Sequence, residues 1–186
     1  ATQESLVFSN KTAMDVYFSG VTHTLEDLEQ FCDTMYAQGS CFRTLALDAD
    51  SISADQMLQA KNTMRQMVRS RTAANTGIMV FDDRLTSKFF RFGSSFLGVS
   101  QPVTVSVMQQ IRGYWLEQET PEKLGWQVMV TDGGNAVVLM QARRYRSVYL
   151  CTMLDLNAYA QQMQGSSPIT YAFLNTDQIL TNADYD

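Results

Sequence analysis

The side chains best suited to chemistry in this chain are two close pairs of aspartates. Asp82 and Asp83 are adjacent, and a single alanine separates Asp48 from Asp50. Each pair could bind a cation or supply a general acid and a general base. Aspartates that flank strands are more often turn residues, because their side chains bond to the nearby backbone. We therefore predict no catalytic residues and no metal site at either pair.

The only histidine, His23, lies within a predicted helix, ahead of the rest of the fold. Nucleophile triads need a histidine beside the nucleophile, and multi-histidine metal sites need several of them. The sequence has no glycine motif for phosphate or dinucleotide binding, since Gly133 and Gly134 belong to a predicted hairpin. We predict a chain that is not an enzyme and has no cofactor. A buried cluster of carboxylates in a cleft would revive the enzyme hypothesis.

Arg143, Arg144 and Arg146 are the densest basic cluster. Guanidinium groups hold carboxylates and phosphates through two parallel hydrogen bonds, so these residues could clamp an anion. Their place at a predicted turn between two strands favours a solvated tip instead. The three cysteines are an odd number without a C-x-x-C spacing. This pattern indicates three partly buried thiols that act as small hydrophobic side chains, and it indicates neither a zinc site nor a disulfide framework.

The composition is that of an ordinary globular protein, with 45% hydrophobic residues among 186. A net charge of -5 argues against nucleic acid or an anionic membrane as the main partner, because both would repel the average surface. The longest uncharged apolar run, Val148 to Leu154, is far short of the roughly 20 residues that span a bilayer. The chain begins Ala1-Thr-Gln-Glu and shows no targeting signal. We expect any membrane attachment to lie in segments outside this chain.

Apolar residues at seven-residue spacing, with further ones four positions later, predict one long helix from about residue 4 to residue 37. Gly20 is its only interruption and Gly39 ends it. At 1.5 Å per residue the helix would be about 50 Å long, more than a small domain needs for packing. The stripe suits a helix that covers a sheet, a dimer seam or a rod that leads to a membrane. It consists of Val7, Met14, Phe18, Val21, Leu25, Leu28, Cys32 and Met35.

Ser53 and Gln56 have the spacing of a capping box and predict a second helix, which ends near Asn75. Its predicted buried stripe is Met57, Ala60, Met64, Met67 and Val68. Alternating apolar residues then predict five strands, with a helical insertion inside 93–125 and a hairpin turn at 132–135. The strands are 78–81, 88–92, 126–131, 136–142 and 147–154, and a short helix follows at 157–163. The predicted fold class is α+β, with a five-stranded antiparallel sheet, a long N-terminal helix and a helical insertion.

Two stretches, 76–87 and 169–182, share one pattern of apolar strand, aspartate-rich turn and second strand. The first is followed by a full set of elements, whereas the second ends with the chain. We therefore divide the sequence into two leading helices at 1–75, a sensor-like module at 76–165, and a linker with the start of a second module at 166–186. Whether the last segment belongs to a second module or completes the first stays open.

This order of elements resembles the PAS-like modules of the Cache superfamily, and most of all the double-Cache extracytoplasmic sensor regions of bacterial histidine kinases and related transmembrane receptors. The phrases that carry the resemblance are Gly77-Ile-Met-Val-Phe-Asp-Asp83, Val148-Tyr-Leu-Cys-Thr-Met-Leu-Asp-Leu156 and Tyr171-Ala-Phe-Leu-Asn-Thr-Asp-Gln-Ile-Leu180. The resemblance implies a membrane-distal module that binds a small molecule between its sheet and the insertion. It also implies that a shift then passes down the long helix.

Some members of the superfamily bind amino acids through a tyrosine, an arginine with a tryptophan-tyrosine pair, and an aspartate after the last strand. Asp155 stands where the resemblance would put that aspartate. Arg112-Gly-Tyr-Trp115 has suitable residue types in a different order, so an amino-acid ligand is not predicted.

The candidate lining of a ligand pocket is mostly aromatic, because small-ligand sites are largely apolar with few polar groups. Side-chain alternation puts Tyr149, Cys151, Met153 and Asp155 on one face of their strand, and groups Trp126 with Val128 and Val130 on its own. Each aromatic residue would also fill a core by default. The candidates are Phe90, Phe92, Tyr114, Trp115, Trp126, Tyr149 and Asp155.

The leading hypothesis is a non-catalytic, extracytoplasmic, ligand-sensing domain of a bacterial transmembrane receptor in a two-component signal-transduction system, with any kinase outside this chain. Its ligand is a small molecule of unknown identity. The alternative is a dimerisation or protein-interaction module without a small ligand. A homodimer through Val7, Met14, Val21 and Leu28 would favour that alternative.

Overall fold

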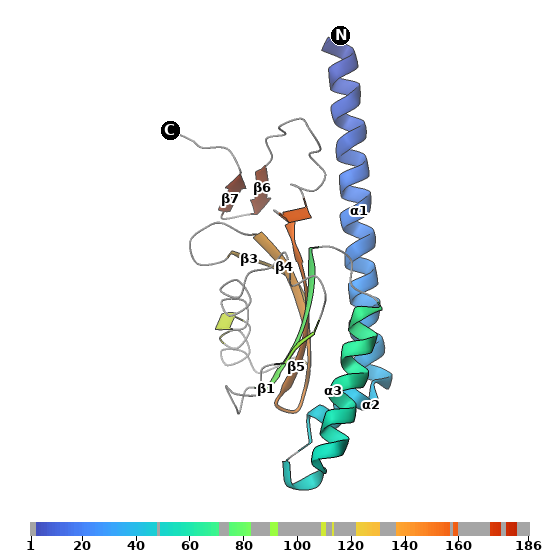
Figure 1. Cartoon of the computed structure of the whole chain (residues 1–186). Helices are drawn as coiled ribbons and strands as arrows, with labels where there is room; N and C mark the ends of the chain where they lie inside the picture. Colours follow the sequence, from blue (N-terminus) through green and yellow to red (C-terminus); the bar gives the residue numbers. More distant parts are fainter. Residues whose placement is uncertain are drawn as a thin grey trace.

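The computed structural model describes residues 3–47, 49–70, 75–82, 90–92, 109–110, 113, 122–130, 137–156, 158–159, 172–175 and 178–181. Within these ranges the chain has the predicted α+β class: a long N-terminal helix packs on an antiparallel sheet, and shorter helices lie beside it (Figure 1).

Helix α1 spans Gln3–Gln38, which confirms the predicted long helix. Its C-terminal half lies along the sheet, and its N-terminal half extends past the sheet (Figure 1). The predicted stripe follows this division, since Val21, Leu28 and Met35 are buried but Met14 and Phe18 are exposed. The backbone N–H of Gly39 donates to the Met35 carbonyl at 2.9 Å. A Cβ at Gly39 would collide with that carbonyl, so the chain can turn there only with glycine.

Two further helices complete this layer. The short α2, Ser40–Leu45, buries Cys41, Phe42 and Leu45, and a single 3-10 turn follows at Ala49–Ser51. Helix α3, Ala54–Arg69, begins at the predicted capping box: Gln56 N–H donates to Ser53 Oγ at 3.2 Å, and Ser53 N–H donates to Gln56 Oε1 at 2.9 Å.

The buried stripe predicted for α3 is confirmed at three of its positions. Ala60, Met64 and Val68 are buried, and Met57 packs at the edge of the core. The prediction was wrong at Met67, which is exposed and whose sulfur lies 3.9 Å from Cys41 Sγ.

The main sheet has the five predicted strands, all antiparallel, in the order β2-β1-β5-β4-β3. Four of the strands are long, and the three-residue β2 adds an edge. The last strand in sequence, β5, is therefore central, between β1 and β4. The bounds are β1 Thr76–Asp82, β2 Phe90–Phe92, β3 Lys123–Val130, β4 Val137–Tyr145 and β5 Val148–Asp155.

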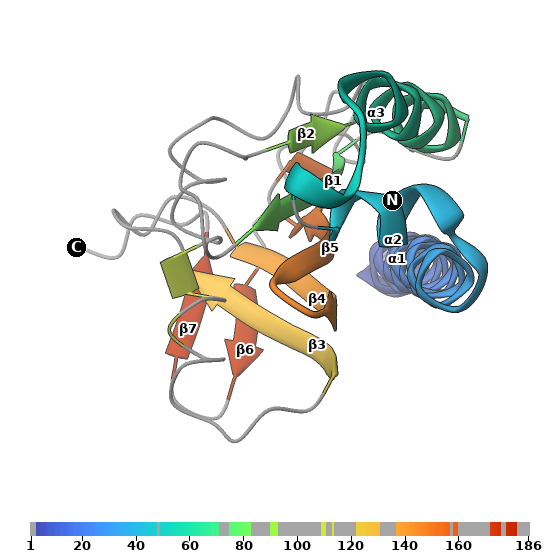
Figure 2. The same cartoon turned by 90° about the horizontal axis from the view of Figure 1, so that it is seen from below.

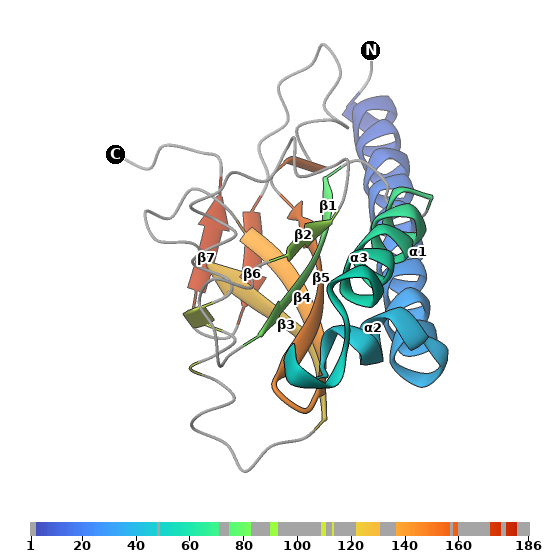
Figure 3. The same cartoon turned by 60° about the horizontal axis from the view of Figure 1, so that its bottom comes forward.

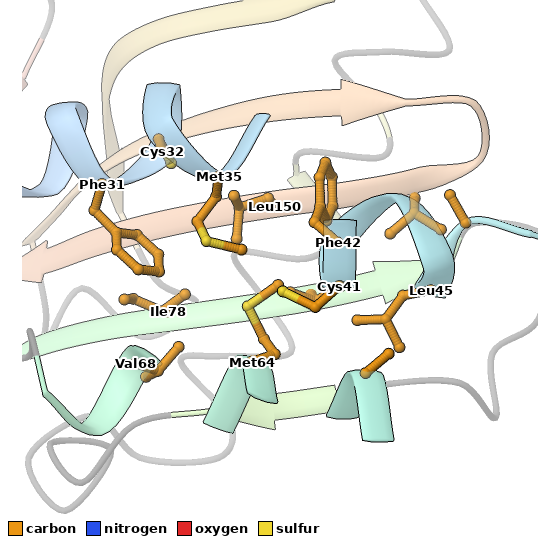
Figure 4. Close-up of a cluster of buried hydrophobic side chains, with 14 residues drawn as sticks. Phe31, Cys32, Met35, Cys41, Phe42, Leu45, Met64, Val68, Ile78 and Leu150 are labelled. Atoms are coloured by element: carbon orange, nitrogen blue, oxygen red, sulfur yellow. The ribbon is translucent and has the colours of Figure 1, made fainter. Parts of the chain in front are cut away.

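Helices α1, α2 and α3 all lie on one face of this sheet (Figure 2). The larger core cluster joins Phe31, Met35 and Phe42 of the helices to Ile78 and Leu150 of the sheet (Figure 4). A second cluster, around Val21, Leu28, Leu154 and Leu156, continues this contact along α1. The helices thus cover one face of β1, β4 and β5, where Leu139 and Tyr145 of β4 are only partly buried.

Strands β6, Ala172–Asn175, and β7, Gln178–Thr181, form a separate two-stranded antiparallel sheet. The second strand-turn-strand pattern is therefore a hairpin whose strands pair with each other and not with the main sheet. It lies on the side of the main sheet away from α1 (Figures 1, 2 and 3). Whether it begins a second module stays a prediction, as do the three domain ranges.

Most of the predicted insertion and nearly all of the predicted helix at 157–163 lie outside the described residues, as does the hairpin turn at 132–135. The described exceptions are residues 109, 110, 113, 158 and 159, which are helical, and residues 122–125. The predicted end of the insertion was wrong, because β3 already begins at Lys123.

Candidate functional site

The helices pack on one of the two faces of the main sheet. Val148, Leu150 and Leu154 of β5 pack with the helices, and the thiol of Cys32 in α1 donates to Thr152 Oγ1 at 3.7 Å. Because successive side chains of a strand point to opposite faces, the odd-numbered residues of β5 point away from the helices. We call these surfaces the helix face and the far face.

Strand register defines the rest of the far face, since directly paired residues share a face. Met79 and Ala142 both pair with Cys151, and Met140 pairs with Met153. These residues form an apolar floor in which every side chain is fully buried. The far face is defined here as Met79, Met140, Ala142, Tyr149, Cys151, Met153 and Asp155.

The floor has a polar residue at each end. Tyr149 lies beside the β4–β5 turn, where the Arg144 guanidinium carbon is 5.6 Å from the centre of its ring. Asp155 lies at the other end of β5. With a rise of about 3.3 Å per residue, the two are separated by roughly 20 Å. Sulfur-rich apolar floors adapt readily to different shapes, because methionine is flexible and polarisable.

Asp155 also has a structural role. Its Oδ1 accepts a hydrogen bond from Ala158 N–H at 2.9 Å, the pattern of a helix N-cap. Its backbone N–H donates to the carbonyl of Asn75, also at 2.9 Å, and Asn75 has a left-handed φ of 63°. The carboxylate therefore ties the end of β5 to the helical turn that follows it.

The predicted lining residues do not all gather on one surface. Tyr149 and Asp155 share the far face, whereas Trp126 packs on the helix face against the cluster around Val21 and Leu28. Phe90 and Phe92 pair through their backbones with Val80 and Ile78, and their side chains lie outside the description. Tyr114 and Trp115 also lie outside the described residues. Contact of any of these residues with a ligand stays a prediction.

The solvated tip predicted for the arginine cluster was wrong for Arg143, which is 1% exposed. Strand β4 continues to Tyr145, so Arg143 lies inside the strand and on the helix face. Its Nε donates to Asp33 Oδ1 at 2.8 Å, and its Nη2 lies 2.7 Å from the same oxygen. Nη1 donates to the carbonyls of Leu124 and Ala142 at 3.3 and 3.1 Å.

Glu29 and Lys123 extend the ion pair between Asp33 and Arg143. Glu29 Oε1 lies 3.8 Å from Arg143 Nη2, and Lys123 Nζ lies 3.4 Å from Glu29 Oε1 and 3.5 Å from Asp33 Oδ2. We call these four residues, Glu29, Asp33, Lys123 and Arg143, the α1 clamp, because they bind α1 to β3 and β4. The signal in the sequence is the four-residue spacing of Glu29 and Asp33, which puts both on one side of a helix.

Partial burial by itself would raise the pKa of Asp33. The hydrogen bond and charge of Arg143, together with the charge of Lys123, outweigh that effect and hold this pKa below its usual value. The carboxylate is therefore charged whenever the clamp is formed near neutral pH.

The described part of the chain gives little support to thiol chemistry. Cys32, Cys41 and Cys151 are free thiols, as predicted, and they are more deeply buried than the sequence suggested. Burial raises the pKa of Cys32 to about 12, although its bond to Thr152 opposes the shift, and burial also raises the pKa of Cys41 and Cys151. Thiols in this state are weak nucleophiles and weak metal ligands.

Comparisons with protein-family models, with curated proteins and with solved structures find no match to this chain. Within the described residues, no three histidine, cysteine or acidic side chains come together as a metal site would require. None of the helices described by the structure is both long enough and apolar enough to cross a membrane.

Proposed function

We propose that this chain is a non-catalytic, small-molecule-sensing module with a PAS-like fold. The observation that carries the proposal is the two-sided sheet, in which the strands that hold α1 also carry the methionine-rich far face. Small-ligand sites are mostly apolar surfaces with a few polar groups for orientation. Met79, Met140 and Met153 supply the apolar floor, and Tyr149 and Asp155 supply polar groups at its ends.

Strand β5 offers a direct route from the far face to α1. Cys151 belongs to the far-face floor, and the next residue, Thr152, accepts the hydrogen bond from Cys32 in α1. In β4, Ala142 lies on the far face and Arg143 is in the α1 clamp. A ligand that favours one arrangement of these strands shifts the position of α1 by its differential affinity for the two arrangements.

The cellular setting follows from the resemblance described above. We propose an extracytoplasmic location in a bacterial transmembrane receptor, most simply a histidine kinase, with α1 as the element that carries the signal. The long helix and the five antiparallel strands, two of them before and three after the predicted insertion, support this assignment.

A thermal-shift screen with organic acids, sugars and amino acids tests ligand binding. A compound at 100 times its dissociation constant should stabilise the fold by about 2.7 kcal/mol. Tyr149→Phe should weaken the binding of that compound, and Trp126→Phe is the matched control because Trp126 lies on the helix face. The proposal fails if no compound stabilises the protein, or if only the Trp126 variant loses binding.

A protein-interaction module is the second candidate, because α1 exposes large apolar side chains beyond the sheet. Met14 is 57% exposed and Phe18 is 56% exposed. Val21 and Leu28 pack within the chain, so the predicted dimer seam cannot run through all four residues. A dimer would instead use the turns around Met14 and Phe18. Sedimentation of the wild type and of Met14→Glu/Phe18→Glu decides this: an association lost in the variant supports the candidate, and a monomeric wild type removes it.

A further inference from the structure

Two arginines from distant parts of the chain each lie against the ring of Tyr145, at the end of the molecule opposite the N-terminus of α1. Helix α2 and the β4–β5 turn lie next to each other there (Figures 1 and 3). The guanidinium carbon of Arg43, in α2, is 5.7 Å from the centre of the Tyr145 ring. The guanidinium carbon of Arg146, in the turn, is 5.8 Å from the same centre. Both arginine side chains are exposed, and Tyr145 is half-buried.

Local contacts hold both arginines in place. Nη2 of Arg43 donates to the carbonyls of Tyr36 and Ala37, at 3.4 and 3.0 Å, where α1 ends and leaves such groups without helical partners. Arg144 Nε donates to the carbonyl of Arg146 at 2.7 Å, which fixes the turn. The guanidinium group of Arg43 is therefore held directly, whereas for Arg146 the backbone of the turn is held, and both guanidinium groups lie beside the Tyr145 ring.

Neither of these arginines forms an ion pair with a carboxylate in the part of the chain that the structure describes. Arg143 and Lys123 differ, since both are bound to Glu29 and Asp33. The chain has a net charge of -5, so carboxylates are plentiful. The carboxylate of Glu122, for example, accepts a hydrogen bond from the Tyr36 hydroxyl and forms no ion pair with Arg43 or Arg146.

The backbone at Arg146 adds an independent observation. Its φ is 56°, a left-handed conformation that glycine adopts without cost and that long side chains rarely adopt. Glycine or asparagine would close this turn with less strain. The turn geometry therefore does not explain why an arginine stands here, whereas a role for its side chain does.

From these contacts we propose that Arg43, Arg146 and the Tyr145 ring form a binding surface for a phosphate group. An arginine that stacks on an aromatic ring keeps N–H donors at its edge. A carboxylate has two oxygens and is satisfied by one guanidinium fork, whereas a phosphate has acceptor oxygens enough for two arginines that approach from different elements. The surface is separate from the far face, so it stands or falls independently of the sensing proposal.

Arginine Nε–Hε NMR signals, followed during titration with inorganic phosphate at constant ionic strength, test the proposal. The signals of Arg43 and Arg146 should shift and saturate, and that of the exposed Arg69 in α3 should not move. Equal shifts with sodium chloride alone, or no saturation, would overturn it.

Substitutions sharpen this test. Arg43→Gln and Arg146→Gly should each weaken phosphate binding about tenfold, the equivalent of one charge-assisted hydrogen bond. Arg69→Gln is the control and should bind phosphate like the wild type. Arg146→Gly should keep or raise the melting temperature, because glycine accepts the positive φ, and this separates a binding defect from misfolding. Wild-type affinity in both test variants would refute the surface.

Two further ligands identify the source of the phosphate. Tripolyphosphate stands for a soluble phosphorylated compound, and vesicles of phosphatidic acid in phosphatidylcholine stand for a lipid headgroup. The phosphate comes from the class of compound whose representative binds the wild type more tightly than inorganic phosphate does. In Arg43→Gln that representative should bind no more tightly than inorganic phosphate. If neither ligand depends on Arg43 and Arg146, the proposal is wrong.

Discussion

At the scale of single residues, the charge of Arg143 is buried between α1 and the sheet, and two carboxylates of α1 compensate it. The Asp33 side chain is half-exposed, whereas the Arg143 side chain is buried. Removal of one partner from a buried ion pair leaves the other charge desolvated and unpaired, which is the larger part of the energetic cost. The two partners of this pair therefore differ in what their loss does.

Asp33→Asn should destabilise the fold more than Arg143→Met. The first change leaves the buried guanidinium with the more distant Glu29 as its carboxylate partner in the clamp. It should cost about 1–3 kcal/mol, a range kept modest because Asp33 is partly solvated. The second change leaves carboxylates that water can reach, and it puts an apolar chain in an interior position. Urea unfolding measures both variants, and a greater loss in Arg143→Met would contradict this account of the clamp.

The α1 clamp also predicts how stability depends on pH. Since the pKa of Asp33 in the fold is lower than its unfolded value of about 3.8, its contribution is complete above that value and disappears as the pH falls through the folded pKa. The free energy of unfolding should therefore drop more steeply in the wild type than in Asp33→Asn below about pH 4. Thermal melts from pH 6 to pH 2 provide the measurement, and parallel curves for the two proteins would disprove the link.

At the scale of elements, α1 and the segment after β5 meet at Gly20. A Cβ at this position would overlap the hydroxyl of Tyr159, whose ring packs edge-on against Tyr17 with 5.4 Å between centroids. The helix thus accepts a poor helix former so that Tyr159 can approach its backbone.

Gly20→Ala should consequently give less than the gain of about 1 kcal/mol that alanine normally brings to a helix interior. In a Tyr159→Phe background, which removes the overlapping oxygen, the full gain should return. Chemical unfolding of the four proteins in this double-mutant cycle checks the expectation. A full gain from Gly20→Ala in the wild type would show that the contact does not constrain α1.

The elements that the sequence predicts best are those with strong local signals. The apolar stripe of α1, the capping box at Ser53 and Gln56, and the continuous apolar run of β5 are each signals from residues close together in the sequence. Helix α2 was missed because a six-residue helix is too short to show a period. The end of β4 was misplaced because its arginines suggested a turn. The charge of Arg143 is acceptable inside a strand because the distant Asp33 and Glu29 of α1 compensate it.

At the scale of the whole molecule, one sheet has two different surfaces. Alternation predicted that Tyr149, Cys151, Met153 and Asp155 share a face, and the structure places them opposite the helices. The sequence could not show whether Trp126 lies on the same face as these four residues. The face on which a side chain lies depends on the register of its strand and, here, on the bulge between Leu124 and Gln127.

The far face is the centre of the proposed function, and its methionines allow a direct test. In a protein labelled with ¹³C at the methionine methyl groups, Met79, Met140 and Met153 report on the far face, and the buried Met35 and Met64 report on the helix face. A compound that stabilises the protein in the screen should shift the three far-face methyl signals first and most strongly. The account is contradicted if such a compound moves only Met35 and Met64, or if no compound moves Met79, Met140 and Met153.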